Sequence, residues 1–169
     1  LVGSEMCIRD SLKGMCSVSQ DENPIRYFDN RLQKEAIKLL PGQYYATASD
    51  KALVTILGSC VAACIFDQEK KIGGMNHFML PDLNLTTNLD TCLATKYGVH
   101  AMNMLIDQLV QLGARRSKLV AKAFGGGKVL PGFVQQDIGR INAEFVLEYL
   151  DNANIPLISS DLMSNYARK

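Results

Sequence analysis

The fold is decided by residues 52–80, which read ALVTILGSCVAACIFDQEKKIGGMNHFML. β-branched and apolar residues fill 52–57 and 61–66, which predicts two buried strands separated by Gly58-Ser59. The polar run 67–71 is typical of a turn, and 72–80 returns as a further strand. We therefore expect an antiparallel hairpin across residues 60–80.

The register of this hairpin decides which side chains meet. If the turn is centred at 69–70, Ala62 faces His77. Side chains two residues apart share one face of a strand, so Cys60 and Cys64 would lie on the face of His77. Cys60 and His77 would then be diagonal neighbours with backbones roughly 7–8 Å apart. A turn longer or shorter by one residue would move them to opposite faces.

Further elements surround the hairpin on both sides. Two helices are predicted at 92–112 and 137–150, where apolar residues recur at steps of three and four, and Gly113 stands at the end of the first helix. Additional strands are predicted at 36–40, 43–48, 118–124 and 155–159. This order predicts an α+β fold, in which mixed β-sheets are sandwiched with two main helices.

Composition excludes several classes of protein. The 169 residues carry a net charge of +1, which argues against a basic surface for nucleic acid. Hydrophobic residues make up 47% and charged residues 21%, so wholesale disorder is excluded. The longest apolar stretch, 52–66, holds 15 residues and is interrupted by Gly58-Ser59, whereas a membrane span needs about 20. We therefore expect no membrane insertion.

The first 30 residues differ from the rest of the chain. Residues 1–14 show no clear period, Met15 is a plausible true start, and 17–30 are largely polar. We interpret 1–30 as a leader and mobile arm and 31–169 as the folded domain.

Five cysteines indicate the compartment. Their odd number and irregular spacing argue against a disulfide framework, and residues 1–20 contain no continuous apolar leader. Cys60 and Cys64 are three residues apart rather than two, so neither a zinc knuckle nor a redox pair is indicated. We expect a reduced, cytoplasmic protein with no metal and no cofactor.

Chemistry is most plausible around Cys60. A thiol becomes a strong nucleophile when an imidazole such as His77 takes its proton, and Thr55 could orient that imidazole. Backbone amides at Gly58 and Ser59 could stabilise an oxyanion. If the thiol and the imidazole form an ion pair, the thiol pKa falls and the imidazole pKa rises. The alternative is that Cys60 is a small buried hydrophobic residue.

Two other features invite a function and have simpler interpretations. His100 lies on the polar side of the first predicted helix, where a solvated surface histidine is the simpler interpretation. The triple glycine 125–127 would let a loop approach the site or a partner, with a flexible turn as the alternative.

Four stretches resemble the CheD family of chemoreceptor glutamine deamidases. They are LGSCVAACIFDQEKKIGGMNHFMLP at 57–81, KAFGGGKVL at 122–130, IGRINAEFVLEYL at 138–150 and IPLISSDL at 155–162. The most specific part is Gly-Ser-Cys with a histidine seventeen residues after the cysteine. The resemblance runs from about residue 39 to the C-terminus.

This resemblance implies an activity and partners. The family is a group of cysteine hydrolases that convert glutamine side chains of methyl-accepting chemotaxis receptors to glutamate and release ammonia. The matching motif implies that Cys60 is the nucleophile, that His77 is the general base and acid, and that Thr55 orients His77. Receptor cytoplasmic domains would be the substrate, and a CheC-type phosphatase a possible partner.

Two departures and one alternative accompany the resemblance. The chain stops at 166–169, where the family usually continues into a further strand, so we expect a truncated C-terminus. Met163-Ser164 also replaces glycines that many members carry. The alternative function is a non-catalytic regulatory module that docks on chemoreceptors or on a CheC-type phosphatase.

Overall fold

The computed structural model describes residues 24–80, 88–128 and 137–169. Two α-helices lie in these segments, α1 (Asn88–Gln111) and α2 (Ile138–Asn152), with a short 3-10 turn, η2 (Arg116–Lys118). The strands are β1 (Ile25–Asp29), β2 (Lys34–Lys38), β3 (Tyr44–Thr47), β4 (Ala52–Val54), β5 (Val61–Asp67), β6 (Ile72–Asn76), β7 (Leu119–Gly125) and β8 (Leu157–Leu162).

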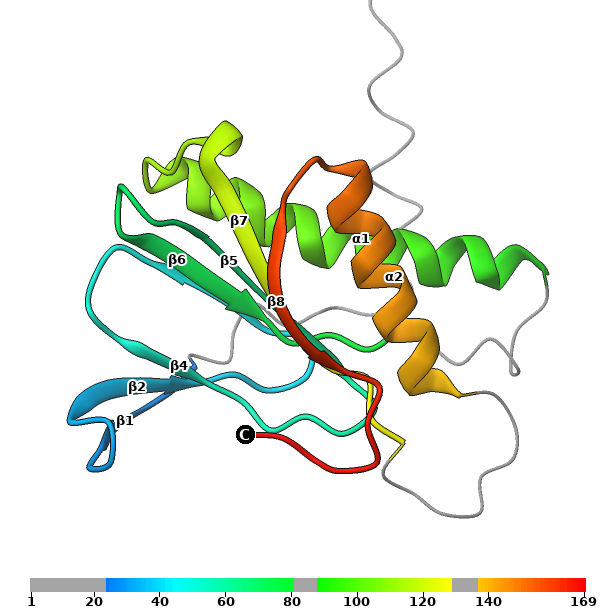
Figure 1. Ribbon diagram of the computed structural model, residues 1–169, viewed down its shortest axis with the longest axis horizontal. Coiled ribbons are helices and arrows are strands. Elements are labelled where there is room, and N and C mark those ends of the chain that lie inside the picture. The colour runs from blue at the N-terminus through cyan, green and yellow to red at the C-terminus, as the bar shows by residue number, and fades with distance from the viewer. Residues whose placement is uncertain (1–23, 81–87, 129–136) are drawn as a thin grey trace, which may run out of the picture.

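These strands form two sheets of mixed direction. The larger sheet has the order β3-β6-β5-β7-β8, and only its β7–β8 pair is parallel. The smaller sheet has the order β1-β2-β4, with β2 and β4 parallel. Figure 1 shows the smaller sheet set apart from the two helices. The predicted α+β fold is confirmed.

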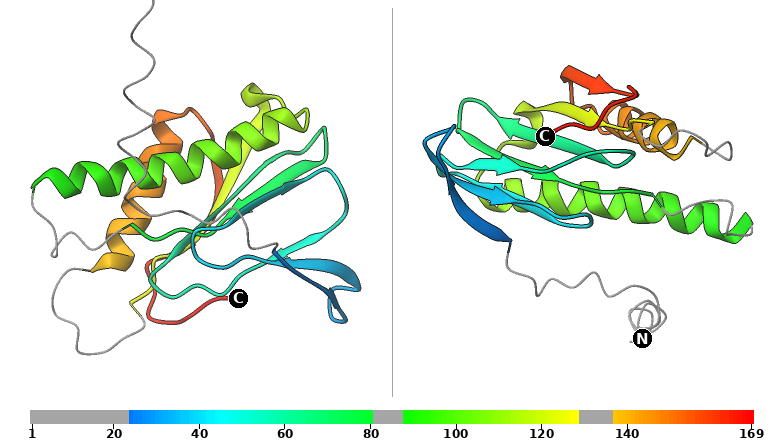
Figure 2. Two further views of the ribbon diagram at one scale, coloured as in Figure 1. Left: turned by 180° about the vertical axis from the view of Figure 1, so that it is seen from behind. Right: turned by 90° about the horizontal axis from the view of Figure 1, so that it is seen from below.

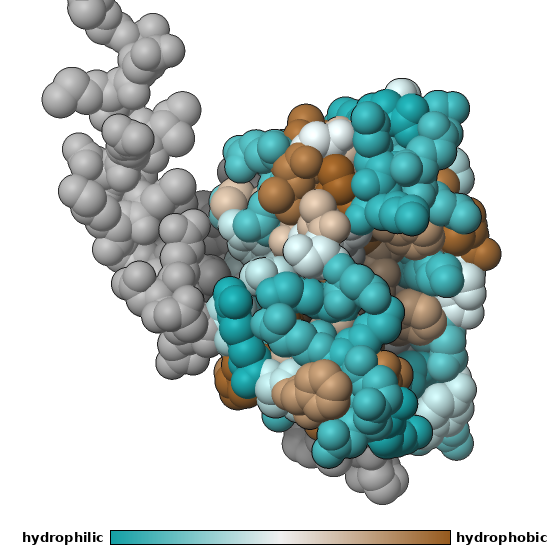
Figure 3. Space-filling model, turned by 90° about the vertical axis from the view of Figure 1, so that its left-hand side faces the viewer, coloured by the Kyte–Doolittle hydropathy of each residue, from teal (hydrophilic) through white to brown (hydrophobic). Residues whose placement is uncertain are grey.

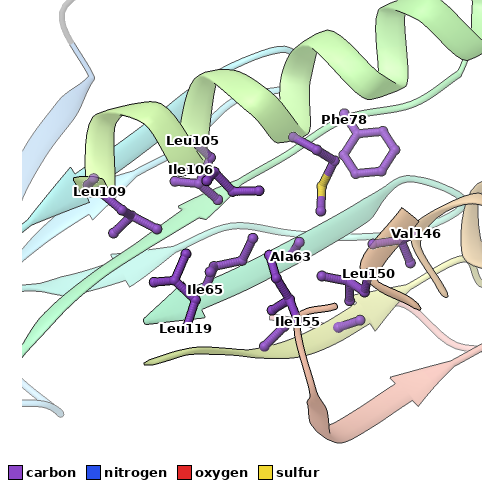
Figure 4. Packing of buried hydrophobic residues seen from close by; sticks show 14 of the residues in the cluster. Ala63, Ile65, Phe78, Leu105, Ile106, Leu109, Leu119, Val146, Leu150 and Ile155 are labelled. Atoms are coloured by element: carbon purple, nitrogen blue, oxygen red, sulfur yellow. The ribbon is translucent and has the colours of Figure 1, made fainter. Parts of the chain in front are cut away.

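One face of the larger sheet packs against both helices. Helix α1 contacts β3, β6 and β5, and α2 contacts β5, β7 and β8. Figure 4 shows Leu105, Ile106 and Leu109 of α1 above Ile65 of β5. All four side chains are fully buried, so this layer removes much of the molecule's apolar surface from water.

The opposite face of the larger sheet packs against the smaller sheet. Ala62 and Met75 from the larger sheet join Ile37, Leu39 and Leu57 in a second buried cluster. Partly buried Cys60 and Cys64 pack against the same cluster. The molecule is therefore built of three layers, helices, large sheet and small sheet, and the left-hand view of Figure 2 shows α1 and the small sheet on opposite sides of the large sheet.

The predicted hairpin register is confirmed. Cys64 pairs with Met75, and an isolated bridge joins Val61 to Phe78 in the same register. This register places Ala62 opposite His77. Regular pairing is interrupted at Asn76, whose side-chain Oδ1 accepts the Ala63 N–H at 2.9 Å. For this reason β6 ends at Asn76, although the sequence predicts a strand to residue 80.

The prediction that residues 1–30 form a leader and arm is wrong for residues 25–29. These residues form β1, which pairs antiparallel with β2. Ile25 and Phe28 are exposed, so this edge strand lacks the apolar alternation by which a strand is recognised. Residues 1–23 lie outside the described segments.

The helix ends follow recognisable local rules. At the end of α1, Gly113 has φ +102°, its N–H donates to the Val110 carbonyl, and the Ala114 N–H donates to the Leu109 carbonyl. This is the Schellman arrangement that the glycine predicts. At the start of α2, the side chain of Asp137 accepts the Arg140 N–H at 3.1 Å.

The side of the molecule that lies on the left in Figure 1 exposes both hydrophilic and hydrophobic residues. Figure 3 shows that most of this surface is hydrophilic, with hydrophobic side chains between the hydrophilic ones. In the part of the chain that the structure describes, no helix combines the length and apolar character needed to span a membrane.

Candidate functional site

His77 lies directly after β6 and is held by its backbone. Its N–H donates to the Gln43 carbonyl at 2.9 Å, and its carbonyl accepts the Gly42 N–H at 2.7 Å. The imidazole is buried, with 3% of the residue exposed. Thr55, directly after β4, is also buried, and its Oγ1 lies 2.8 Å from His77 Nδ1. The structure therefore brings together these two residues from different sheets.

The hydrogen bonds of Thr55 assign the proton on His77. The hydroxyl donates to the Leu39 carbonyl at 2.8 Å, and a hydroxyl has only one hydrogen to donate. Thr55 Oγ1 must then accept from His77, so we assign the proton to Nδ1. In the neutral ring, Nε2 therefore carries a free lone pair.

Nε2 of His77 has an unusual environment. It is buried and has no hydrogen-bond partner among the described residues. Buried polar atoms are rarely left unpaired, and a catalytic role is one explanation for those that are. The arrangement presents a buried basic nitrogen that is available to accept a proton.

Cys60 stands directly before β5, at the end of the Gly58-Ser59 turn. The Cys60 carbonyl accepts the Gly126 N–H at 2.8 Å, and the Gly58 carbonyl accepts the Gly127 N–H at 2.8 Å. The triple glycine therefore lies against the turn that carries the cysteine, which confirms the expectation that it approaches the site. Gly58, Ser59 and Cys60 are all partly exposed, so this turn is accessible from solvent.

The confirmed register makes Cys60 and His77 diagonal neighbours on one face of the larger sheet. The thiol does not hydrogen-bond to Nε2, since that atom has no partner among the described residues. Catalytic hydrogen bonds are often long or absent in a free enzyme and form when substrate binds.

The pKa directions differ from those expected of an ion pair. Burial raises the pKa of the Cys60 thiol above its ordinary value, partly opposed by its own backbone N–H. Burial lowers the pKa of His77, opposed by the Leu39 carbonyl. Both directions are opposite to those expected of an ion pair, and they favour the neutral form of each group in the free protein. The reason is that neither group has a charged partner to offset its loss of hydration.

A cleft of about 690 Å³ lies on the same side of the large sheet. Thr55, Leu57 and Cys64 are part of its lining, with the C-terminal residues 166–169 on another side. Burial raises the pKa of Cys64 to about 11, with the charge of Lys122 partly opposing it. Cys64 is therefore a poor nucleophile at neutral pH.

The structure describes only part of the remaining candidate residues. His100 is exposed on α1, as predicted. Cys7 and Cys16, and the side chain of Cys92, lie outside what the structure describes. No group of three or more His, Cys, Asp or Glu side chains within the described segments is placed to hold a metal ion.

Comparison with known proteins points to one family. The family model described as "CheD chemotactic sensory transduction" matches residues 79–169. The chain is 51% identical over 146 residues to the "Probable chemoreceptor glutamine deamidase CheD 1" of Shewanella oneidensis, which covers 86% of this chain and 71% of that protein. It is 49% identical over 144 residues to the protein of the same name from Dechloromonas aromatica, covering 85% and 71% of the two chains. It is 51% identical over 144 residues to the "Probable chemoreceptor glutamine deamidase CheD" of Methylobacillus flagellatus, again covering 85% and 71%.

Proposed function

Because this chain belongs to the CheD family, we propose that it is a thiol amidohydrolase that deamidates glutamine side chains of chemoreceptors. The observation that carries the proposal is the buried, unpartnered Nε2 of His77, whose ring is fixed by Thr55 on the face of the sheet that carries Cys60. Relatives about half identical in sequence bear the name of this activity.

The first half of the reaction forms a thioester. Nε2 of His77 takes the proton of the Cys60 thiol as the sulfur attacks the carboxamide carbon of a receptor glutamine. The carbonyl oxygen becomes an oxyanion in the tetrahedral intermediate. As the intermediate collapses, the C–N bond breaks and His77 returns the proton to the departing nitrogen, which leaves as ammonia.

The second half releases glutamate. His77 takes a proton from water as the water oxygen attacks the thioester carbon. The C–S bond then breaks, the thiol regains its proton, and the glutamine side chain has become a carboxyl group. The net change is one water consumed and one ammonia released for each glutamine.

Backbone amides around the turn supply the oxyanion site in this proposal. Gly58 and Ser59 are partly exposed and leave the backbone accessible, and the N–H of Cys60 partly opposes the rise that burial causes in the pKa of its thiol. An amide next to the attacking atom is well placed for the oxygen of the same carboxamide. Such donors contribute a large share of the rate in acyl transfer.

A neutral Cys60 thiol and a neutral His77 imidazole are the starting forms that this mechanism requires. A lowered pKa keeps His77 unprotonated near neutral pH, which a general base requires. A raised thiol pKa keeps the proton on sulfur until the imidazole takes it during attack. Thr55 prevents ring rotation and fixes the tautomer that leaves Nε2 basic.

Partners and compartment follow from the same proposal. The substrates are glutamines in the cytoplasmic domains of methyl-accepting chemotaxis receptors, so the protein acts in the cytoplasm and needs no cofactor. A CheC-type phosphatase is the proposed regulatory partner.

The experiment is mass spectrometry of a receptor cytoplasmic domain incubated with the protein. We expect a gain of about one mass unit for each converted glutamine, because NH₂ is replaced by OH. Cys60→Ala should abolish the gain, whereas the control Cys64→Ala should retain it. Intact glutamines with retained receptor binding would reject the enzyme and support a regulatory module instead.

A further inference from the structure

Asn142 is a fully buried polar residue that joins α2 to the turn before Cys60. Its Nδ2 donates to the Ser59 carbonyl at 2.9 Å. Its Oδ1 accepts the Leu80 N–H at 2.8 Å. Asn142 is 0% exposed and its bond to Leu80 is buried, whereas its bond to the partly exposed Ser59 is part-buried. Nothing in the sequence distinguishes Asn142, since an asparagine within a helix pattern carries no functional signal by itself.

The bond to Ser59 fixes a peptide plane. The described chain contains no cis peptide, so the carbonyl of Ser59 and the N–H of Cys60 point in opposite directions. Asn142 draws the carbonyl toward α2. The Cys60 N–H is consequently directed away from the helix.

The neighbouring carbonyls of the turn are held in the same manner. Gly127 binds the carbonyl of Gly58, and Gly126 binds the carbonyl of Cys60. A Cβ added at Gly139, in the first turn of α2, would lie 2.6 Å from the Gly126 carbonyl oxygen. Helix α2 and the triple glycine 125–127, the glycine loop, are thus packed backbone against backbone. Together they bind all three carbonyls of the turn.

We propose that Asn142 is a positioning residue for deamidation, which orients the Ser59–Cys60 peptide so that the Cys60 N–H donates to the oxyanion. This rests on the function proposed above. Asn142 does not touch the substrate and acts through the peptide that it holds. Loss of its donor would free the peptide to rotate, at the point where charge develops in the transition state.

The alternative is a purely structural role, in which Asn142 only joins α2 to Leu80. Both roles lower stability when the residue is replaced, so stability cannot separate them. The rate at which iodoacetamide alkylates Cys60 separates the two roles. Alkylation displaces iodide from carbon, so it needs the thiol and His77 but forms no oxyanion. A positioning role predicts slow deamidation with normal alkylation, and a structural role predicts that both rates fall together.

The experiment compares Asn142→Asp with wild type and with Asn152→Asp. Aspartate keeps an acceptor for the Leu80 N–H but places a second acceptor against the Ser59 carbonyl. The control makes the same chemical change at an exposed position of the same helix. The full-length chain is assayed for kcat and KM on a receptor domain, for its unfolding temperature, and for the alkylation rate of the Cys60 peptide. Asn142→Ser, with a smaller side chain that fits the site, replaces Asn142→Asp if the latter does not fold.

We expect kcat of Asn142→Asp to fall by about 100-fold, with KM and Cys60 alkylation within about twofold of wild type. Asn152→Asp should match wild type in all three. An unchanged kcat, or alkylation that falls in proportion to kcat, would overturn the inference while leaving the proposed function intact. Absence of turnover by the wild type would reject both.

Discussion

At the residue scale, the single hydrogen of the Thr55 hydroxyl determines which nitrogen of His77 is basic. Thr55 donates to Leu39 and therefore accepts from Nδ1. Removing the hydroxyl would leave Nδ1 unpaired and the ring free to rotate or change tautomer. Activity would fall because the imidazole loses its orientation, and not because a charge is lost, since threonine carries none.

Thr55→Val tests this role. Valine has nearly the same shape and no hydroxyl, so we expect kcat for deamidation to fall by roughly 10–100-fold, a typical effect of losing a partner that orients a histidine. The measurement is steady-state turnover of a receptor domain. Thr55→Ser keeps the hydroxyl and should retain most activity. If the valine variant is as active as the serine variant, Thr55 does not orient His77.

The pKa of Cys60 gives a second prediction at this scale. Burial raises this pKa, so the thiol is protonated at neutral pH and should react slowly with iodoacetamide at pH 7. The rate should rise with pH toward a midpoint above the ~8.5 of a free thiol. The measurement is labelling of the Cys60 peptide against pH, with a short thiol peptide as control. A midpoint below that of the peptide would show a preformed ion pair.

The sequence could predict that Cys60 and His77 share a face of the sheet, but not the charge states of the two side chains. Cys60 and His77 follow from the hairpin register, because alternation along a strand determines which residues share a face. Thr55 and His77 meet because two sheets cross, which the sequence pattern does not contain. Burial of both groups is a property of the packed layers, and for that reason the pKa directions differed from expectation.

At the element scale, the hairpin was predictable and the edge strand was not. The turn 67–71 sets the register of β5 and β6, and both strands have a strong apolar pattern. β1 has exposed apolar side chains and is held in the sheet by backbone hydrogen bonds to β2. Backbone pairing of this kind produces no clear pattern of apolar residues in the sequence.

The glycine loop offers a test of how the elements meet at the turn. Gly125 has φ +108°, and a Cβ there would lie 2.1 Å from the Cys60 carbonyl oxygen. Gly113 has a similar φ of +102°, but its Cβ would meet nothing nearer than 3.8 Å. Alanine costs backbone strain at both positions and a steric clash only at Gly125.

We expect Gly125→Ala to lower the unfolding temperature more than Gly113→Ala and to abolish most deamidation. Gly113→Ala should cost about 1 kcal/mol of stability and leave turnover near wild type. Thermal unfolding and receptor deamidation of both variants provide the comparison. Equal effects of the two substitutions would mean that only the backbone strain of a positive φ matters. The turn at residues 58–60 would then tolerate displacement by the Cβ at position 125.

At the scale of the whole molecule, the site depends on contacts between all three layers. Thr55 directly follows β4 of the small sheet, Cys60 and His77 lie next to β5 and β6 of the large sheet, and α2 of the helical layer contributes Asn142. Burial of His77 between the sheets therefore requires the complete fold. The free energy of unfolding should report this burial through its dependence on pH.

The sign follows from the lowered pKa of His77. Between that pKa and the ~6.5 of an unfolded histidine, the unfolded chain binds more protons than the native protein. The free energy of unfolding should therefore fall as pH drops below about 6.5. A second decrease in the free energy of unfolding should follow near pH 4 and below, because Arg115 lowers the pKa of Asp67 and Arg168 lowers that of Asp161.

Denaturant unfolding from pH 7.5 to 5 measures only the decrease that we assign to His77. His77→Gln should flatten it, and His100→Gln, at an exposed position on α1, serves as the control. If His77→Gln retains the full decline over this range, His77 is not buried in its neutral form, and it could not act as the base without a change in the free structure.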